Sequence, residues 1–90
     1  MTDIEHDDLF RRVGYYDFRA YTQRTSNGLN QGFVLVLHHM MLGTVQSVFR
    51  AGKPQAQSAI ALAMALEKLQ HLVAIAAEDD LPLGSGEQSI

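Results

Sequence analysis

The stretch "VLVLHHMMLGTV", Val34 to Val45, places two adjacent histidines inside an otherwise apolar run. The apolar character begins at Phe33 and continues through Phe49. A β-strand is usually about five or six residues long, so a run of this length favours a helix, although the valines at its start are also compatible with a strand. We therefore predict a helix over residues 31–51.

This predicted helix is apolar on nearly all sides, a property of helices that are buried all round. Two further helices from so short a chain cannot easily surround it. The surplus apolar surface therefore indicates an interface with a second copy of the chain or with a target protein. The residues predicted to make that contact are Phe33, Leu37, Met40, Met41, Val45, Val48 and Phe49.

A second helix is predicted over residues 54–78, where "PQAQSAIALAMALEKLQHLVAIAAE" is rich in strong helix formers. The preceding "RAGKPQ", residues 50–55, combines Gly52 as a left-handed stop with Pro54 in the first turn of the next helix. A short reversal of this kind forces the two helices to pack side by side. The sequence therefore predicts an antiparallel helical hairpin.

The amino-terminal residues are predicted to form a third helix that begins with a capping box, Thr2 with Glu5. Apolar residues follow at helical spacing: Leu9, Val13, Tyr16 and Ala20. A break is expected near Gly14, and the aromatics of "YYDFRAYTQ", residues 15–23, also allow a strand. Residues 79–90 lose periodicity and are expected to be a mobile tail. The predicted fold is one all-α domain over residues 1–90, completed as a bundle by dimerisation.

Composition limits the classes of function. The chain has 90 residues, 47% of them apolar and 19% charged, and no cysteine, which excludes disulfides and thiolate zinc sites. So small a core is commonly reinforced by association with another copy. The net charge of −3 gives no electrostatic reason to expect nucleic acid. The acidic start "MTDIEHDDLF" is unlike a signal peptide, and we find no apolar run of membrane-spanning length, so we expect a cytoplasmic protein that binds no membrane.

Catalytic and metal-binding patterns are weak. His38 and His39 are neighbours, and on a helix they project about 100° apart, so they chelate poorly. Glu67 and His71 are four residues apart and could meet either histidine across the hairpin. His38, His39, Glu67 and His71 are therefore the candidate ligands of a metal site, which ranks below the other functions considered. "RRVGYYDFRAYTQR" alternates arginine with aromatics in the manner of single-strand binders, but packed aromatics with solvated arginines are favoured in an acidic protein. No catalytic residue and no cofactor is predicted.

Residues 20–83 resemble the flagellar secretion chaperones in the order of their features. These are an "AY" pair, a polar loop, the apolar "FVLVLHHMMLGTVQSVFRAG", a glycine-marked turn and an alanine-rich segment ending in "LEKLQHLVAIAAEDD". The resemblance implies a helical clamp for another protein's helix, with Leu37, Met41 and Val45 as contacts.

The function expected from the sequence is therefore a small helical interaction factor that masks an apolar surface of a cytoplasmic partner, as an inhibitor, anti-activator or secretion chaperone. It is expected to be a homodimer and not an enzyme. Two alternatives stay open, a histidine-based metal protein or enzyme and a purely structural homodimer.

Overall fold

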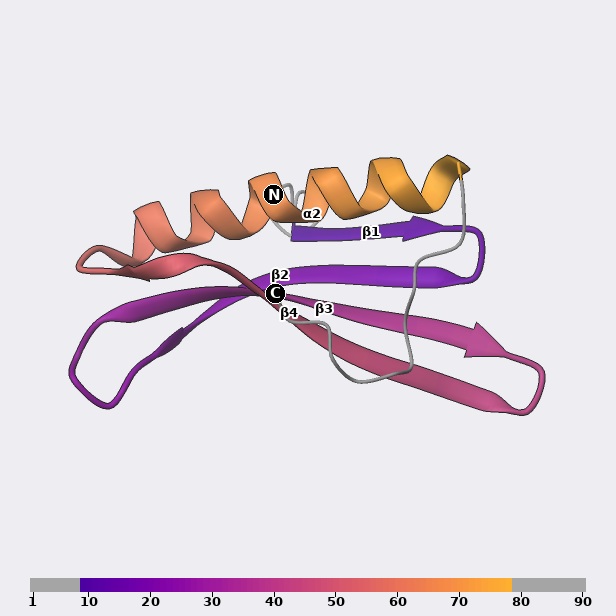
Figure 1. Ribbon diagram of the computed structural model, residues 1–90, viewed down its shortest axis with the longest axis horizontal. Helices are drawn as coiled ribbons and strands as arrows, with labels where there is room; N and C mark the ends of the chain where they lie inside the picture. Colours follow the sequence, from indigo (N-terminus) through magenta and orange to yellow (C-terminus); the bar gives the residue numbers. More distant parts are fainter. Residues whose placement is uncertain (1–8, 79–90) are drawn as a thin grey trace, which may run out of the picture.

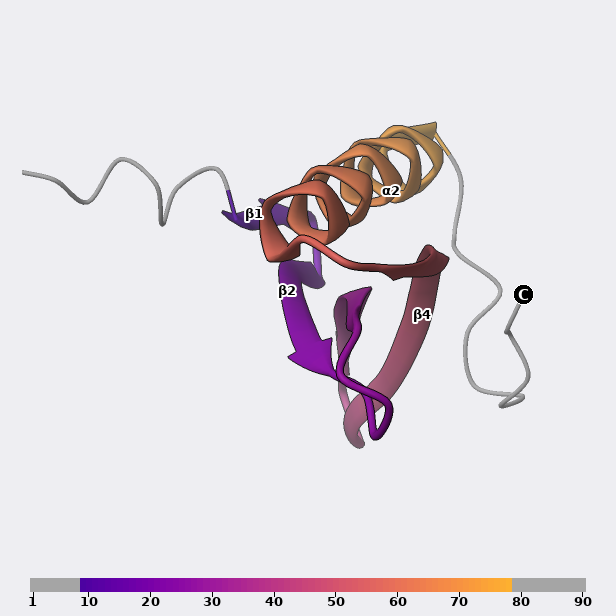
Figure 2. The same ribbon diagram turned by 90° about the vertical axis from the view of Figure 1, so that its left-hand side faces the viewer.

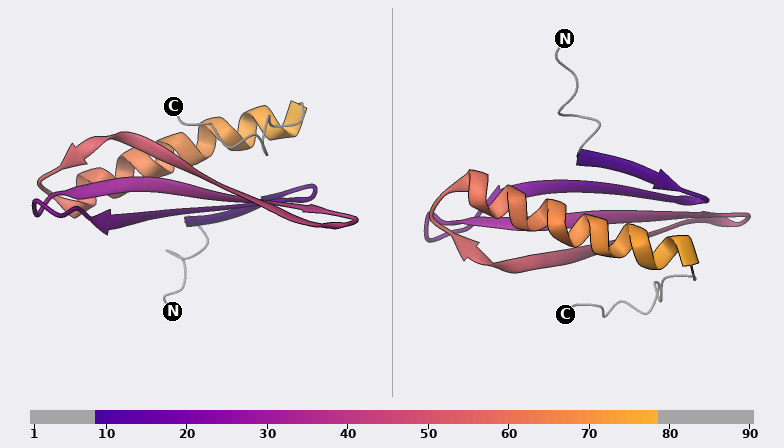
Figure 3. Two further views of the ribbon diagram at one scale, coloured as in Figure 1. Left: turned by 60° about the horizontal axis from the view of Figure 1, so that its bottom comes forward. Right: turned by 90° about the horizontal axis from the view of Figure 1, so that it is seen from above.

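The computed structural model describes residues 9–78, which form a four-stranded antiparallel sheet followed by one long helix (Figure 1). The strands are neighbours in sequence order, each joined to the next by a hairpin turn. The elements are β1 (Phe10–Val13), β2 (Tyr16–Arg24), β3 (Asn30–Met40), β4 (Gly43–Gln55) and α2 (Ser58–Glu78). The helix lies on one side of the twisted sheet (Figure 2) and crosses the strands obliquely (Figure 3).

The predicted helix over residues 31–51 is wrong, and with it the all-α helical hairpin. That stretch is most of the β3–β4 hairpin, which turns at Met41 and Leu42 and pairs Met40 with Gly43. Gly43 has a φ of 149°, a conformation that favours glycine. The apolar run is long because it spans two strands and a turn that lacks the usual polar turn residues.

The predicted amino-terminal helix is also wrong from Phe10 onward, although Leu9 is helical. Residues 10–13 and 16–24 are strands, so the strand alternative for residues 15–23 is the one the structure adopts. Gly14, where a break was expected, has a φ of 58° in the tight turn between β1 and β2. The capping box at Thr2 and Glu5 lies outside the described residues, as does the tail at 79–90.

The reversal predicted at residues 50–55 is wrong as well, because these residues are the end of β4. Gly52 does have a positive φ, 75°, but within a strand that shows a register shift opposite Asn30 and Gly32. The helix predicted over 54–78 is present from Ser58 to Glu78. It packs on a sheet and has no second helix beside it among residues 9–78.

The core lies between the sheet and α2. Its largest fully buried side chains are Phe18, Leu69, Val34 and Val36. Helix and sheet pack closely at Gly32, where an added Cβ would lie 2.5 Å from the carbonyl oxygen of Ala61 and 3.2 Å from the Cβ of Ala65. A glycine on β3 and alanines on α2 therefore set how closely the two layers pack.

By length and composition α2 could cross a membrane, since its 21 residues include a window of mean hydropathy 1.5. This corrects the sequence-based statement that no apolar run is long enough to span a membrane. The same helix packs on the sheet through Ala61, Ala65, Leu69 and Leu72, and the core helix of a soluble protein meets the same criterion. The observation is weak evidence of a span.

Candidate functional site

The sheet has a face turned away from α2, here called the open face. Successive side chains of a strand point to opposite sides, and Tyr16, Phe18, Val34 and Val36 are buried toward the helix. Their neighbours therefore point to the open face. Its apolar centre consists of Phe10, Tyr21, Phe33, Leu35, Leu37 and Val48.

The central strand β3 is apolar on both of its faces. Residues 33–37 read "FVLVL", with Val34 and Val36 fully buried under α2 and Leu35 and Leu37 only partly covered on the open face. A continuous apolar run is typical of a strand buried on both faces, whereas the solvated face of an antiparallel sheet normally alternates to polar residues. The open face therefore has the composition of a sheet face that packs against another protein surface.

The side chains around this centre are those enriched at protein interfaces. Tyr21 and Phe33 stack with ring centroids 5.3 Å apart, and Arg19 and Arg50 lie exposed on either side. The four strands contain no glutamate and a single lysine, Lys53, near the end of β4. Aromatic residues and arginine are enriched at interface cores, while lysine, glutamate and aspartate are depleted there.

One polar network on the open face joins all four strands. Arg12 of β1 donates to both carboxylate oxygens of Asp17 on β2, with Nε to Oδ1 at 2.6 Å and Nη2 to Oδ2 at 3.0 Å. A carboxylate only accepts, so His39 Nε2 of β3 is the donor in its 2.8 Å bond to Asp17 Oδ2. His39 Nδ1 lies 3.2 Å from the Thr44 hydroxyl of β4. We call these four residues the cross-strand clamp.

The clamp has the carboxylate, imidazole and hydroxyl order of a hydrolase relay. However, Arg12 holds the carboxylate with two bonds, and the hydroxyl is secondary and sits in the cross-strand pair of His39 and Thr44. Cross-strand pairs of this kind stabilise a sheet. We therefore interpret the clamp as a structural link that fixes strand register at this end of the open face.

The clamp predicts a pH-dependent stability. Hydrogen bonding to Arg12 is the main cause that lowers the pKa of Asp17 to about 2, burial opposes it, and the His39 hydrogen bond adds to the lowering. Because the folded pKa is below the ordinary value of about 3.9, the stabilisation is complete above that value and is lost as the pH falls toward 2. We expect Asp17→Asn to lower the unfolding free energy by about 1–2 kcal/mol at pH 7, since Arg12 is largely solvent-exposed.

Urea unfolding of both proteins between pH 7 and pH 2 checks this expectation. The difference between them should shrink as the pH falls below 4. Glu67→Gln, on the exposed side of α2, is the matched control and should show almost no difference at any pH. A difference between wild type and Asp17→Asn that is the same at pH 2 and pH 7 would contradict the assigned cause.

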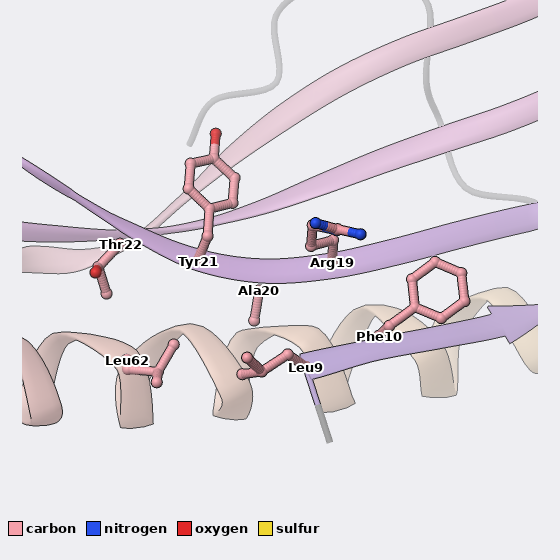
Figure 4. A pocket seen from close by; sticks show the side chains of 7 residues that line it. All are labelled: Leu9, Phe10, Arg19, Ala20, Tyr21, Thr22 and Leu62. Atoms are coloured by element: carbon pink, nitrogen blue, oxygen red, sulfur yellow. The ribbon is translucent and has the colours of Figure 1, made fainter. Parts of the chain in front are cut away.

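A second feature is a hollow of about 370 Å³ beside β2 (Figure 4). β1 pairs with β2 only over Tyr16 to Arg19, so β2 continues beyond β1 to Arg24. Leu9, Ala20 and Leu62 line the hollow on the helix side of β2, and Arg19 and Tyr21 line it on the other side, with Phe10 at one end. The hollow therefore straddles a strand edge.

The structure separates the seven residues predicted to contact a partner into three groups. Phe33, Leu37 and Val48 lie on the open face, whereas Val45 and Phe49 lie on the helix side of the sheet, where Phe49 packs against the core. Met40 and Met41 lie at the tip of the β3–β4 hairpin, where Met41 is 96% exposed. The open-face residues Phe10, Arg19, Tyr21 and Leu35 were missed. They could have been found by assuming strands, in which every second side chain points to the same face. Interpreting these residues as helices groups them differently.

The four metal candidates are not brought together. His38 stacks on Tyr16 on the helix side of the sheet, with centroids 4.2 Å apart, while His39 belongs to the clamp on the open face. Glu67 and His71 line a groove between α2 and β4. Among residues 9–78, no three histidine, aspartate or glutamate side chains are grouped closely enough to hold a metal ion.

Charge is divided unevenly along the chain. All seven lysine and arginine residues lie within residues 9–78, which contain three acidic residues, Asp17, Glu67 and Glu78. The other seven acidic residues lie in 1–8 and 79–90. Residues 9–78 are therefore net basic, and the overall charge of −3 is a poor guide to their surface.

Comparisons with known proteins give no match, so the functional assignment depends on the open face and its surroundings. No family model matches the chain, and neither a curated protein nor a solved structure is found to be similar to it. The helical bundle implied by the resemblance to flagellar secretion chaperones is not the fold of residues 9–78. Fold and site together define a class, a small antiparallel sheet with one face closed by a helix and one apolar face open.

Proposed function

We propose that the protein is a homodimeric protein-interaction module, without enzymatic activity, whose open face packs on the open face of a second copy. The observation that carries this proposal is the apolar character of β3 on both sides, with only one side covered by α2. Two sheets pack face to face at about 10 Å when their inner faces are apolar. A second copy supplies such a sheet.

The size of the face suits a dimer. Strands about 4.8 Å apart and about 3.3 Å long per residue give the open face a flat area of about 500 Å². A standard interface buries roughly 800 Å² per partner, so a dimer contact would extend over most of this face. Arg19 and Arg50 lie on β2 and β4, the two strands that flank β3.

A second candidate is favoured by a different observation. Surfaces that bind single-stranded nucleic acid combine stacked aromatic residues with positive charge. The open face has the stacked pair of Tyr21 and Phe33 with two arginines beside it, and residues 9–78 are net basic. Leucine and valine at the centre of the face favour the protein interface instead. The experiment below separates the two.

Sedimentation velocity of the full chain over a range of concentrations tests the proposal. We expect a species of twice the chain's mass of 10.0 kDa at micromolar concentration, and no change when oligothymidylate is added. A monomer at every concentration contradicts the proposal. A monomer that also binds oligothymidylate, and loses that binding on Arg19→Glu, would support the second candidate.

A further inference from the structure

We propose that the hollow beside β2 binds an extended peptide of a partner protein, which adds a strand to β2 and places an acidic side chain against Arg19. This site lies at the β2 edge of the sheet and shares Phe10, Arg19 and Tyr21 with the open face, whereas Leu35, Leu37 and Val48 of the dimer contact do not line it. It goes beyond the proposed dimer, because it supplies a surface for a foreign partner.

The backbone of β2 offers hydrogen bonds at this edge. His39 N donates to Tyr15 O at 2.9 Å, which makes that cross-strand pair a hydrogen-bonded one. Hydrogen-bonded and non-hydrogen-bonded pairs alternate in an antiparallel ladder, so odd-numbered residues of β2 bond to β3 and even-numbered residues point the opposite way. Thr22 and Arg24 therefore direct their N–H and C=O groups to the edge, beyond Phe10, where β1 begins.

The hollow accepts the side chains of an added strand on both sides of that edge. Leu9 and Leu62 give it an apolar wall on the helix side (Figure 4). Neighbouring side chains of an extended peptide alternate between the two sides. A peptide bound here would place an apolar residue between Leu9 and Leu62 and its neighbour beside Arg19 and Tyr21.

Charge selects the kind of peptide. Arg19 is exposed and makes no ion pair with any residue within 9–78, and Arg24 lies further along the same strand. None of the side chains that line the hollow is acidic. Strand addition draws affinity from main-chain bonds and specificity from side-chain pockets. An extended peptide with an acidic residue next to an apolar one would match both Arg19 and the apolar wall of Leu9 and Leu62.

The test is selection from a displayed library of random octapeptides on the full-length protein, followed by affinity measurements on the enriched peptides. We expect enriched peptides to carry an apolar residue beside Asp or Glu. Thr22→Pro removes the outward amide without touching the β2–β3 ladder, and should weaken binding at least tenfold. Thr22→Val keeps the amide and is the matched control.

Arg19→Glu should weaken binding by a similar factor, whereas Arg50→Glu, on the far strand β4, should leave it unchanged. Leu35→Lys should leave peptide binding intact, which separates this site from the dimer contact. The proposal is overturned if no peptide is enriched, or if enriched peptides bind Thr22→Pro as well as wild type. If peptides bind only after residues 1–7 are removed, the edge belongs to the chain's own amino terminus. That result would also overturn the proposal.

Discussion

Leu35→Lys is expected to convert the dimer into a monomer while leaving the fold of each chain intact. Leu35 lies at the centre of the open face, opposite Arg19 on β2 and Val48 on β4. It is only partly covered in the single chain, so a lysine there can extend into water without unfolding the sheet. In a two-fold contact, the same change removes two leucines from the interface and adds two like charges.

The magnitude follows from burial. Leu35 is already partly covered in the single chain, so covering the rest of its surface contributes less than the about 1.5–3 kcal/mol of a fully buried leucine. The loss of two leucines together with the burial of two like charges is expected to weaken association by about 3 kcal/mol, or more than 100-fold in Kd. Sedimentation velocity measures this directly, and thermal unfolding followed by circular dichroism checks that the monomer is folded. The control is Ile75→Lys, an equally drastic change at a 48% exposed position of α2, which should leave the dimer intact.

Two results would contradict this account of the open face. One is a Leu35→Lys protein that sediments as the wild type does. The other is a loss of association in Ile75→Lys alone, which would move the interface to the outer surface of α2.

Phe18→Ala is expected to lower the unfolding free energy by about 3–5 kcal/mol, because it leaves a cavity in the core between sheet and helix. Phe18 is 0% exposed and lies on β2, opposite Val36 and beside Tyr16. A small domain has a total stability of about 5–15 kcal/mol, so this single change brings it close to unfolding. Urea denaturation gives the difference.

Tyr15→Ala is the matched control for Phe18→Ala, since Tyr15 is an aromatic residue that is 75% exposed in the β1–β2 turn. Its substitution should change stability by less than about 0.5 kcal/mol. Equal effects of the two substitutions would contradict the placement of Phe18 under α2.

The helix α2 could be predicted because alanine, leucine, methionine and glutamate over residues 58–78 agree in propensity and in period. The sheet could not, because β3 is apolar on both faces and so lacks the alternation that identifies a strand. The turn at Met41 and Leu42 also lacks polar turn residues, so two strands read as one long run. The apolar run was nevertheless visible in the sequence, and the structure divides it among the open face, the helix side of the sheet and the tip of the β3–β4 hairpin.

The candidate site was predicted only in part for the same reason. A helical wheel groups Met41 with Val45 and Val48, whereas in the sheet strand register puts Val45 on the helix side and Val48 on the open face. Phe10, Tyr21 and Arg19 belong to strands that the helical interpretation assigned to a separate helix. The clamp of Arg12, Asp17, His39 and Thr44 joins residues up to 32 positions apart, and only strand register brings them together.

The central claim is that a second copy covers the open face, and isotope-filtered nuclear Overhauser spectroscopy on a mixture of labelled and unlabelled chains tests it most directly. The account predicts contacts between chains from the methyl groups of Leu35, Leu37 and Val48, and none from Ile75 on α2. Contacts between chains that arise from Ile75 and not from these three residues, or none at all at concentrations where the protein is fully associated, would contradict it.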